Sequence, residues 1–191
     1  SDRHICGIIS VADSIRPETP DLIRQLKAAG IRRVVMLTGD NQGTADAVGR
    51  AAGVDEVRAE LLPEDKLLAI QAIQREHGSV AMVGDGVNDA PALARADIGL
   101  AMGAAGTATA LETADVAIMD DDPRKLVTFI RLSQATGTIL WQNIALALGI
   151  KVVFFALAFT GQATLWMAVF ADMGASLLVV FNGLRLLQWQ R

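Results

Sequence analysis

Two long apolar stretches near the C-terminal end, residues 144–160 and 163–184, constrain the fold of this chain more than any other feature. Each is about as long as a helix that crosses the hydrocarbon core of a bilayer. Only a short turn around Gly161 and Gln162 separates them. We therefore predict a hairpin of two transmembrane helices, and the alternative is a buried helical hairpin in a soluble protein.

Charged residues around this hairpin predict its orientation. Basic residues flank the pair on both sides and are absent from the turn: Arg124, Lys125, Arg131, Arg185 and Arg191. Because Lys and Arg collect on the cytoplasmic side of membranes, we expect residues 1–143 and the C-terminus to be cytoplasmic. We expect an integral protein of the cell (plasma or inner) membrane, with the lipid bilayer as one partner.

Residues 1–122 form an acidic segment with 11 Lys and Arg against 20 Asp and Glu. Such a segment cannot replace the counterions around a nucleic acid, so we expect no nucleic-acid partner. Short apolar runs alternate with longer patterned segments, which is typical of βα units that build a parallel sheet. We predict strands at residues 5–11, 33–37, 80–83, 98–101 and 116–118. We predict helices at residues 20–29, 44–52, 63–76, 89–95 and 107–114.

The predicted fold class is therefore α/β, with a Rossmann-like parallel sheet followed by helices. The acidic run of residues 120–122 and Pro123 end the sheet-forming part. After them we predict an amphipathic stalk helix at residues 124–143. The expected domains are residues 1–122, a stalk at 123–143 and the transmembrane hairpin at 144–187.

Two carboxylates follow the predicted strand at residues 80–83. The strand runs directly into the segment Gly84-Asp85-Gly86-Val87-Asn88-Asp89, which places Asp85 and Asp89 four residues apart. In an open parallel sheet, ligands bind at the carboxyl ends of the strands. Carboxylate oxygens are ligands that suit Mg²⁺ beside a phosphate, so we predict a magnesium site here.

A second strand, ending at Leu37, leads into Thr38-Gly39-Asp40. The Thr38 hydroxyl and the amides after it precede a predicted helix, where phosphoryl oxygens bind well. Lys66 adds a point charge for the same phosphate. Taken singly, each feature is explained by helix capping or by a solvated loop. Together, on successive strand ends, they predict a phosphate site.

Residues 36–40, 63–67 and 82–93 closely resemble the phosphorylation domain of P-type ATPases, members of the haloacid dehalogenase-like superfamily. The last segment, M-V-G-D-G-V-N-D-A-P-A-L, is highly specific. The resemblance implies catalytic roles for seven residues: Thr38, Gly39, Asp40, Lys66, Asp85, Asn88 and Asp89. It also implies that Asp13 and Arg16 form the family's D-x-x-R hinge segment beside the bound nucleotide and phosphate. The implied cofactors are Mg²⁺ and ATP.

The family's nucleophile lies in a D-K-T-G-T segment, which this sequence does not contain. We therefore expect the nucleophile, the nucleotide-binding domain, the actuator domain and earlier membrane helices to lie upstream, in the remainder of the same pump. Because the nucleophile's strand is central in the family's sheet, we expect the sheet here to be incomplete. On its own the chain is expected neither to hydrolyse ATP nor to be very stable. The alternatives are a catalytically inactive truncated module and a membrane-anchored haloacid dehalogenase-like phosphatase.

Each predicted membrane helix contains one charged residue, Lys151 in the first and Asp172 in the second. Both lie about ten residues from the turn, or about 15 Å along a helix, so we expect them at one depth and paired. Charged residues at such depth are costly and usually functional. We interpret Asp172 as an oxygen ligand of a transported cation and Lys151 as its internal counter-ion. A structural ion pair is the alternative.

The same helices resemble the last two helices of heavy-metal P-type ATPases of the zinc, cadmium and lead class. The matching segments are residues 143–151, 171–176 and 182–185. Copper-class relatives would be expected to have Tyr-Asn in the first helix, and this sequence contains no Tyr. The resemblance implies ATP-driven export of Zn²⁺, Cd²⁺ or Pb²⁺, with Cys-Pro-Cys ligands on an upstream helix.

Overall fold

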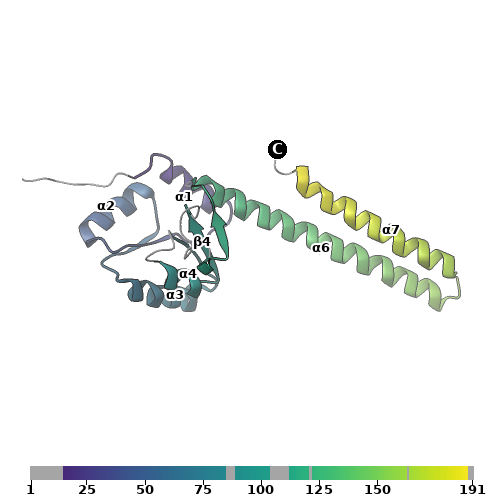
Figure 1. Cartoon of the computed structure of the whole chain (residues 1–191). Coiled ribbons are helices and arrows are strands. Elements are labelled where there is room, and N and C mark those ends of the chain that lie inside the picture. The colour runs from purple at the N-terminus through teal and green to yellow at the C-terminus, as the bar shows by residue number, and fades with distance from the viewer. Residues whose placement is uncertain (1–14, 85–88, 104–111, 121, 163, 189–191) are drawn as a thin grey trace, which may run out of the picture. The chain divides into compact units, whose positions relative to one another are not determined.

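The structure is a computed structural model that describes residues 15–84, 89–103, 112–120, 122–162 and 164–188 of the 191-residue chain. The chain divides into two compact units, residues 1–127 and residues 128–191. Helices and strands alternate in the first unit, whereas the described part of the second contains only helices and the turn that joins them (Figure 1).

The first unit has the predicted α/β architecture. Its strands are β1 (Val35–Leu37), β2 (Glu56–Arg58), β3 (Ala81–Gly84), β4 (Ile98–Met102) and β5 (Val116–Ile118). Its helices are α1 (Thr19–Ala28), α2 (Gln42–Ala52), α3 (Pro63–His77) and α4 (Ala90–Arg95). Eight of these elements lie within two residues of their predicted bounds, and β2 was not predicted. The predicted strand at 5–11 and most of the predicted helix at 107–114 lie outside the described residues.

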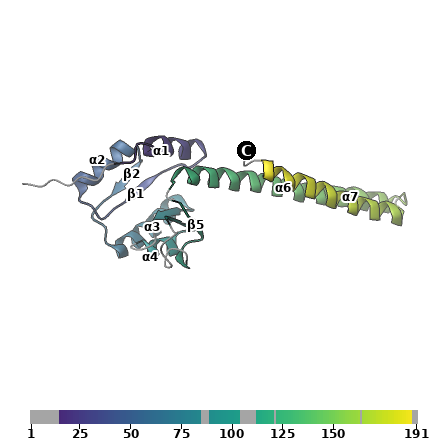
Figure 2. The same cartoon turned by 45° about the horizontal axis from the view of Figure 1, so that its top comes forward.

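The described strands pair in parallel, as predicted, but they form two sheets. One sheet contains β1 and β2, and the other has the order β3-β4-β5. Figure 2 shows β1 and β2 with α1 and α2, and β5 with α3 and α4. The expectation that the sheet lacks its central strand stays a prediction, because the predicted strand at residues 5–11 lies outside the described part of the chain.

An aspartate precedes each of three strands. Its carboxylate hydrogen-bonds to the neighbouring strand, or to the residue just before that strand, near the amino end of the pair. Each carboxylate accepts a hydrogen bond of 2.8 Å from a backbone amide: Asp55 from Val34, Asp97 from Val80 and Asp115 from Gly99. Each Asp lies directly before the first residue of β2, β4 or β5. These carboxylates therefore bind backbone amides next to the first paired residues, which would otherwise lack a partner in the sheet.

Two of these carboxyl groups are acidified by their hydrogen bonds. The Val80 amide and the Gln74 side chain hold the pKa of Asp97 below its ordinary value. The Lys27 ammonium, 2.6 Å from Asp55, lowers the pKa of that carboxyl, and the Val34 amide adds to the effect. Hydrogen bonds to the charged form favour it over the neutral acid.

The core beside the candidate site joins α3, β3 and α4. Its buried members are Ile70, Met82, Ala92 and Leu93, and the partly buried Leu37, Val80 and Ala96 pack against them. Gly99 of β4 lets α4 approach closely, because a Cβ there would lie 2.7 Å from the Leu93 carbonyl oxygen. The end of β1 is thus packed into the same core as α4.

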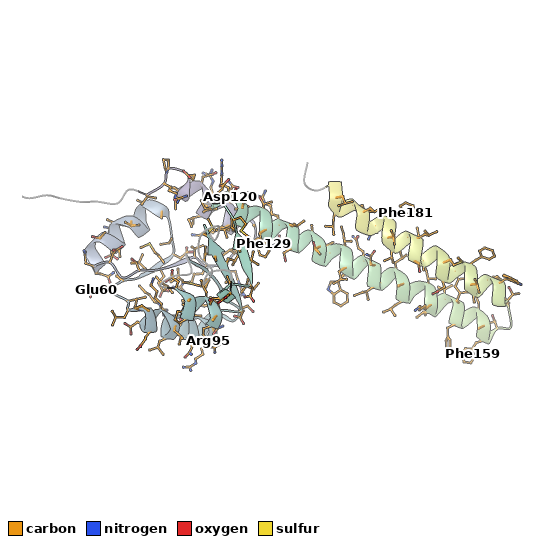
Figure 3. All side chains as sticks on the ribbon, in the orientation of Figure 1. Glu60, Arg95, Asp120, Phe129, Phe159 and Phe181 are labelled. Atoms are coloured by element: carbon orange, nitrogen blue, oxygen red, sulfur yellow. The ribbon has the colours of Figure 1, made fainter. Side chains whose placement is uncertain are left out.

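The second unit contains most of α6 (Arg124–Phe159), all of α7 (Leu165–Leu184) and a short 3₁₀ helix at Arg185–Gln188. The predicted stalk and first membrane segment form one continuous helix of 36 residues. Two helices, Arg124–Phe159 and Trp166–Leu187, are long and apolar enough to cross a membrane. Large side chains on them are exposed, such as Phe159 and Phe181, which are labelled in Figure 3.

Candidate functional site

The centre of the candidate phosphate site is an ion pair between α3 and the start of α4. Lys66 Nζ lies 2.6 Å from Asp89 Oδ1, and each side chain is only 15% exposed. The packing of α3 against α4 in the core holds the two helices, and therefore the two charges, together. The Asp89 side chain also packs closely on the end of β3, because a Cβ at Gly84 would lie 2.7 Å from Asp89 Oδ2.

The Thr38-Gly39-Asp40 segment forms a tight polar loop after β1. The Thr38 hydroxyl donates to Asp40 Oδ2 at 2.9 Å and accepts from the Asp40 amide at 3.1 Å. Asn41 then caps α2, because its side-chain oxygen accepts the Thr44 amide at 3.0 Å. Capping of this kind fixes where the helix begins and how the preceding loop enters it.

Residues 60 and 61 hold this loop in place from the neighbouring segment. The Leu61 amide donates to the Thr38 carbonyl oxygen at 3.0 Å, and the Glu60 amide donates to the Asp40 carbonyl oxygen at 2.8 Å. Glu60 has a φ of 57°, a left-handed conformation that costs energy for any residue with a Cβ. Gly39 fits closely here, because a Cβ would lie 3.3 Å from the Leu61 carbonyl oxygen.

The same segment starts α3 and so connects the loop to Lys66. Pro63 lies in the first turn, where its missing amide costs nothing. Asp65 Oδ2 accepts a hydrogen bond of 3.0 Å from the Leu62 amide, and the Lys66 amide donates to the Leu62 carbonyl oxygen. A continuous set of contacts therefore runs from Thr38 through Leu61 to the ion pair of Lys66.

The structure brings together one part of the predicted site and leaves another part outside its description. Thr38, Gly39, Asp40, Lys66 and Asp89 lie on elements packed around one core. Asp13, Asp85 and Asn88 lie outside the described residues. Arg16 lies just before α1, where its carbonyl oxygen accepts the Thr19 amide at 3.0 Å.

The donor atoms of this site suit a hard cation. Carboxylate and hydroxyl oxygens are the groups that Mg²⁺ prefers, and the described part of the site contains neither Cys nor His. Among the described residues no group of three or more His, Cys, Asp and Glu side chains could hold a metal by itself. The residues present therefore fit Mg²⁺ only as part of a larger ligand set, in which Asp85 is predicted to take part.

The structure does not form the predicted ion pair between Lys151 and Asp172. Both side chains are exposed, and no salt bridge or hydrogen bond joins them. The groove between the two helices is lined by neighbouring residues, among them Ile150 on α6 and Ala171 on α7. Because successive residues of a helix point about 100° apart, Lys151 and Asp172 lie beside this groove rather than in it.

Sequence reasoning missed several residues that shape these sites. Glu60 and Leu61 hold the polar loop through their backbone amides, which no side-chain pattern shows. The signal that was available is the Leu62-Pro63-Glu64-Asp65 start of a helix, which places residues 60 and 61 directly before it. Asn143 and Asn182, which join α6 to α7, are polar residues in apolar helices and could have been recognised on that ground.

Comparison with known families and proteins agrees with this geometry. The profile of the haloacid dehalogenase-like hydrolase family matches residues 1–97. A probable cadmium-transporting ATPase of Staphylococcus aureus is 51% identical over 98% of this chain, which covers 26% of that protein. A cadmium, zinc and cobalt-transporting ATPase of Bacillus subtilis is 44% identical over 98% of the chain and 27% of its own length. The chain thus spans about a quarter of these relatives and corresponds to a C-terminal portion of them.

A solved structure has a similar fold over most of this chain. The crystal structure of a zinc-transporting PIB-type ATPase in its E2.Pi state superposes with a TM-score of 0.85 at 47% sequence identity. The match covers 92% of this chain and 28% of that protein. A family match over half of the chain thus agrees with the fold, with the polar loop of Thr38 and with the Lys66–Asp89 pair. The chain belongs to the haloacid dehalogenase-like hydrolases, and along almost its whole length it is similar to metal-transporting P-type ATPases.

Proposed function

We propose that this chain is the C-terminal portion of an ATP-driven pump that exports divalent heavy-metal ions. The observation that carries the proposal is the combination, in one chain, of the Lys66–Asp89 and Thr38 site with two helices that could cross a membrane. Identity of 51% to a probable cadmium-transporting ATPase over 98% of the chain, and of 48% to a zinc-transporting ATPase over 97% of it, supports the same conclusion.

In this proposal the first unit stabilises a phosphoryl group on an aspartate supplied by the upstream part of the pump. The Thr38 hydroxyl and the amides of Gly39 and Asp40 bind phosphoryl oxygens. Asp85 and Asp89, with Asn88, hold Mg²⁺, which when bound neutralises charge on the transferred phosphoryl group. Asp13 and Arg16 form the hinge segment beside the nucleotide and phosphate.

Lys66 contributes a fixed positive charge to this site. An ammonium group has three donors, and Asp89 Oδ1 occupies one of them at 2.6 Å. The remaining donors are available for phosphoryl oxygens, while Asp89 holds the long side chain in one place. Such preorganised charge stabilises the transition state of phosphoryl transfer without a cost of reorganisation.

The second unit is proposed to carry part of the transport site. Asp172 provides a hard oxygen ligand and Lys151 an internal counter-ion that replaces the metal when it leaves. Oxygen ligands suit a divalent ion better than Cu⁺, which prefers sulfur. The relatives are named for cadmium, zinc and cobalt transport, and lead stays a prediction from the resemblance alone.

The remaining partners follow from the same proposal. ATP is bound by the nucleotide-binding domain of the upstream remainder, and the bilayer surrounds α6 and α7. The basic residues at the start of α6 and after α7, such as Lys125 and Arg185, favour a cytoplasmic location for residues 1–143 and for the C-terminus.

The test uses two substitutions in the full-length pump in lipid vesicles. Asp85→Asn should abolish the phosphoenzyme formed from ATP. Asp172→Ala should abolish zinc-stimulated ATP hydrolysis but retain phosphorylation by inorganic phosphate, which requires no transported metal at the membrane site. Normal zinc stimulation in Asp172→Ala would refute the transport-site assignment. ATP hydrolysis by the purified 191-residue chain alone would refute the assignment of the nucleophile to the upstream part.

A further inference from the structure

Asn182 of α7 connects the two membrane helices through its side-chain amide. Its Nδ2 donates to Asn143 Oδ1 at 2.9 Å and to Gln142 Oε1 at 3.3 Å, both on α6. Asn143 and Asn182 are partly buried, whereas most of their neighbours along both helices are exposed. Polar side chains in such apolar helices commonly bond across to the neighbouring helix.

Arg185 determines which way this amide is turned. Arg185 Nη1 lies 2.9 Å from the side chain of Asn182, and a guanidinium group can only donate hydrogen bonds. The atom it contacts must therefore be the oxygen, Oδ1, which leaves the NH₂ group to donate toward α6. All three polar groups are then satisfied in one orientation, and the contact is directional.

The groove between the helices shows the same antiparallel register as this contact. Ile150 of α6 and Gly174 of α7 line one groove, and each lies eight residues from Gln142 or Asn182 respectively. In this register Lys151 is eight residues from Asn143 and nine from Gln142, and Asp172 is ten residues from Asn182. At a rise of 1.5 Å per residue the two charged residues differ in depth by about 1.5 to 3 Å.

We propose that Asn143, Asn182 and Arg185 form a polar clasp that fixes the register of α6 against α7, and thereby the common depth of Lys151 and Asp172. They are positioning residues for the metal site of the proposed function. Their effect on the metal rests on that function, whereas their effect on the register does not.

The apolar groove alone cannot set this register. Ala171, Gly174 and Ala175 are small, and the side chains opposite them are apolar, so one helix could slide by a turn and keep similar contacts. A slide of four residues would separate Lys151 and Asp172 in depth by about 6 Å. The same slide would break both hydrogen bonds of Asn182. Hydrogen bonds between membrane helices average about 0.6 kcal/mol, which is about a threefold change in population for each bond.

The first experiment measures the register in the full 191-residue chain in lipid nanodiscs. All variants carry Cys6→Ser and a cysteine at position 154. A second cysteine at position 170 reports the observed register, and one at position 166 or 174 reports a slide of one turn in either direction. We expect disulfide formation chiefly at 154 with 170. Asn182→Leu should reduce this preference by about threefold or more, through loss of its bonds to α6.

Two further variants keep this experiment decisive. Asn143→Asp retains an acceptor for Asn182 and should keep the preference. Asn143→Leu removes one of the two bonds to α6 and should reduce the preference about threefold, which gives a second measurement if Asn182→Leu fails to insert. Thr138→Val is the matched control, because its hydroxyl donates to the Gln134 carbonyl oxygen within α6 at 3.0 Å. An unchanged cross-linking preference in both leucine variants would overturn the clasp.

The second experiment measures zinc binding without turnover in the full-length pump. Asn143→Leu should weaken zinc binding by about threefold, with binding recovered in Asn143→Asp and phosphorylation by inorganic phosphate unchanged in both. If Asp172→Ala abolishes zinc binding, then unchanged zinc affinity in a clasp variant with an altered register would overturn the positioning role. A register change accompanied by normal zinc binding in Asp172→Ala would instead refute the metal site and support the clasp.

Discussion

Lys66 and Asp89 form an ion pair of 2.6 Å between two helices, although 23 residues separate them in the sequence. Each is 15% exposed, so removal of one leaves the other partly buried without its charge partner. This differs from an ion pair on an open surface, whose net contribution to stability is small. The site therefore contains a coupling that a double-mutant cycle can measure.

We predict a coupling of about 1 kcal/mol between these two residues in the free energy of unfolding. Lys66→Met and Asp89→Asn would be combined in the full chain in detergent. The protection of α3 and α4 would be measured by hydrogen exchange in urea. Lys125 and Asp120, an exposed ion pair, provide the control cycle with a coupling near zero. Equal couplings in the two cycles would contradict the importance of burial here.

Glu60 offers a test of the backbone strain beside the polar loop. In Glu60→Gly the left-handed φ of 57° becomes acceptable, whereas Glu60→Ala keeps the strain. Both variants lose the contact of the Glu60 carboxylate with the Gln42 amide at 3.4 Å. We predict that Glu60→Gly is more stable than Glu60→Ala by about 1 kcal/mol, measured by urea unfolding. A more stable alanine variant would contradict this conformation.

The carboxyl group of Asp97 gives a pH dependence with a definite sign. Its pKa in the folded chain is lowered from the ordinary value of 3.8, chiefly by the Val80 amide. The stabilisation is therefore fully present above pH 3.8 and is lost as the pH falls through the lower folded pKa. We predict that the amide shift of Val80 in NMR spectra titrates with a midpoint below 3.8. In Asp97→Asn this titration should vanish, and a midpoint above 3.8 in the unmodified chain would contradict the hydrogen bond.

Gly49 tests how closely α2 packs on β2. A Cβ at this position would clash with Val57 Cγ2, so Gly49→Ala should destabilise the first unit by about 1–3 kcal/mol. Gly43→Ala on the same helix is the control, because its nearest neighbour would be the Asn41 side-chain oxygen at 3.5 Å. Both would be measured by hydrogen exchange of β2. A tolerated Gly49→Ala would show that the two elements can move apart freely.

Local sequence signals predicted most of the first unit, and the reason is visible at α3. Pro63 followed by Glu64 and Asp65 marks a helix start, and the helix begins at Pro63. The strand β2 was missed because Glu56-Val57-Arg58 has two charged residues in three positions. Its strand conformation comes from pairing with β1, a partner that local pattern does not reveal.

The membrane helices show a different limit. Counting residues from the turn predicted a common depth for Lys151 and Asp172, and the register of Asn182 with Gln142 and Asn143 agrees with it. Counting does not determine how each helix is rotated about its axis. The rotation follows from which small and apolar residues line the groove, and it turns both charged side chains away from it.

Asp55 and Asp97 place two acid-sensitive contacts of the first unit at the amino ends of β2 and β4, opposite the strand ends where the polar loop lies. Loops after the strands can therefore change conformation while the beginnings of the strands remain joined by these hydrogen bonds. Protonation of Asp55 or Asp97 at low pH would weaken its hydrogen bond to the Val34 or Val80 amide and loosen the beginnings of these strands. Destabilisation by acid and conformational change in the loops would thus occur in separate regions of one small domain.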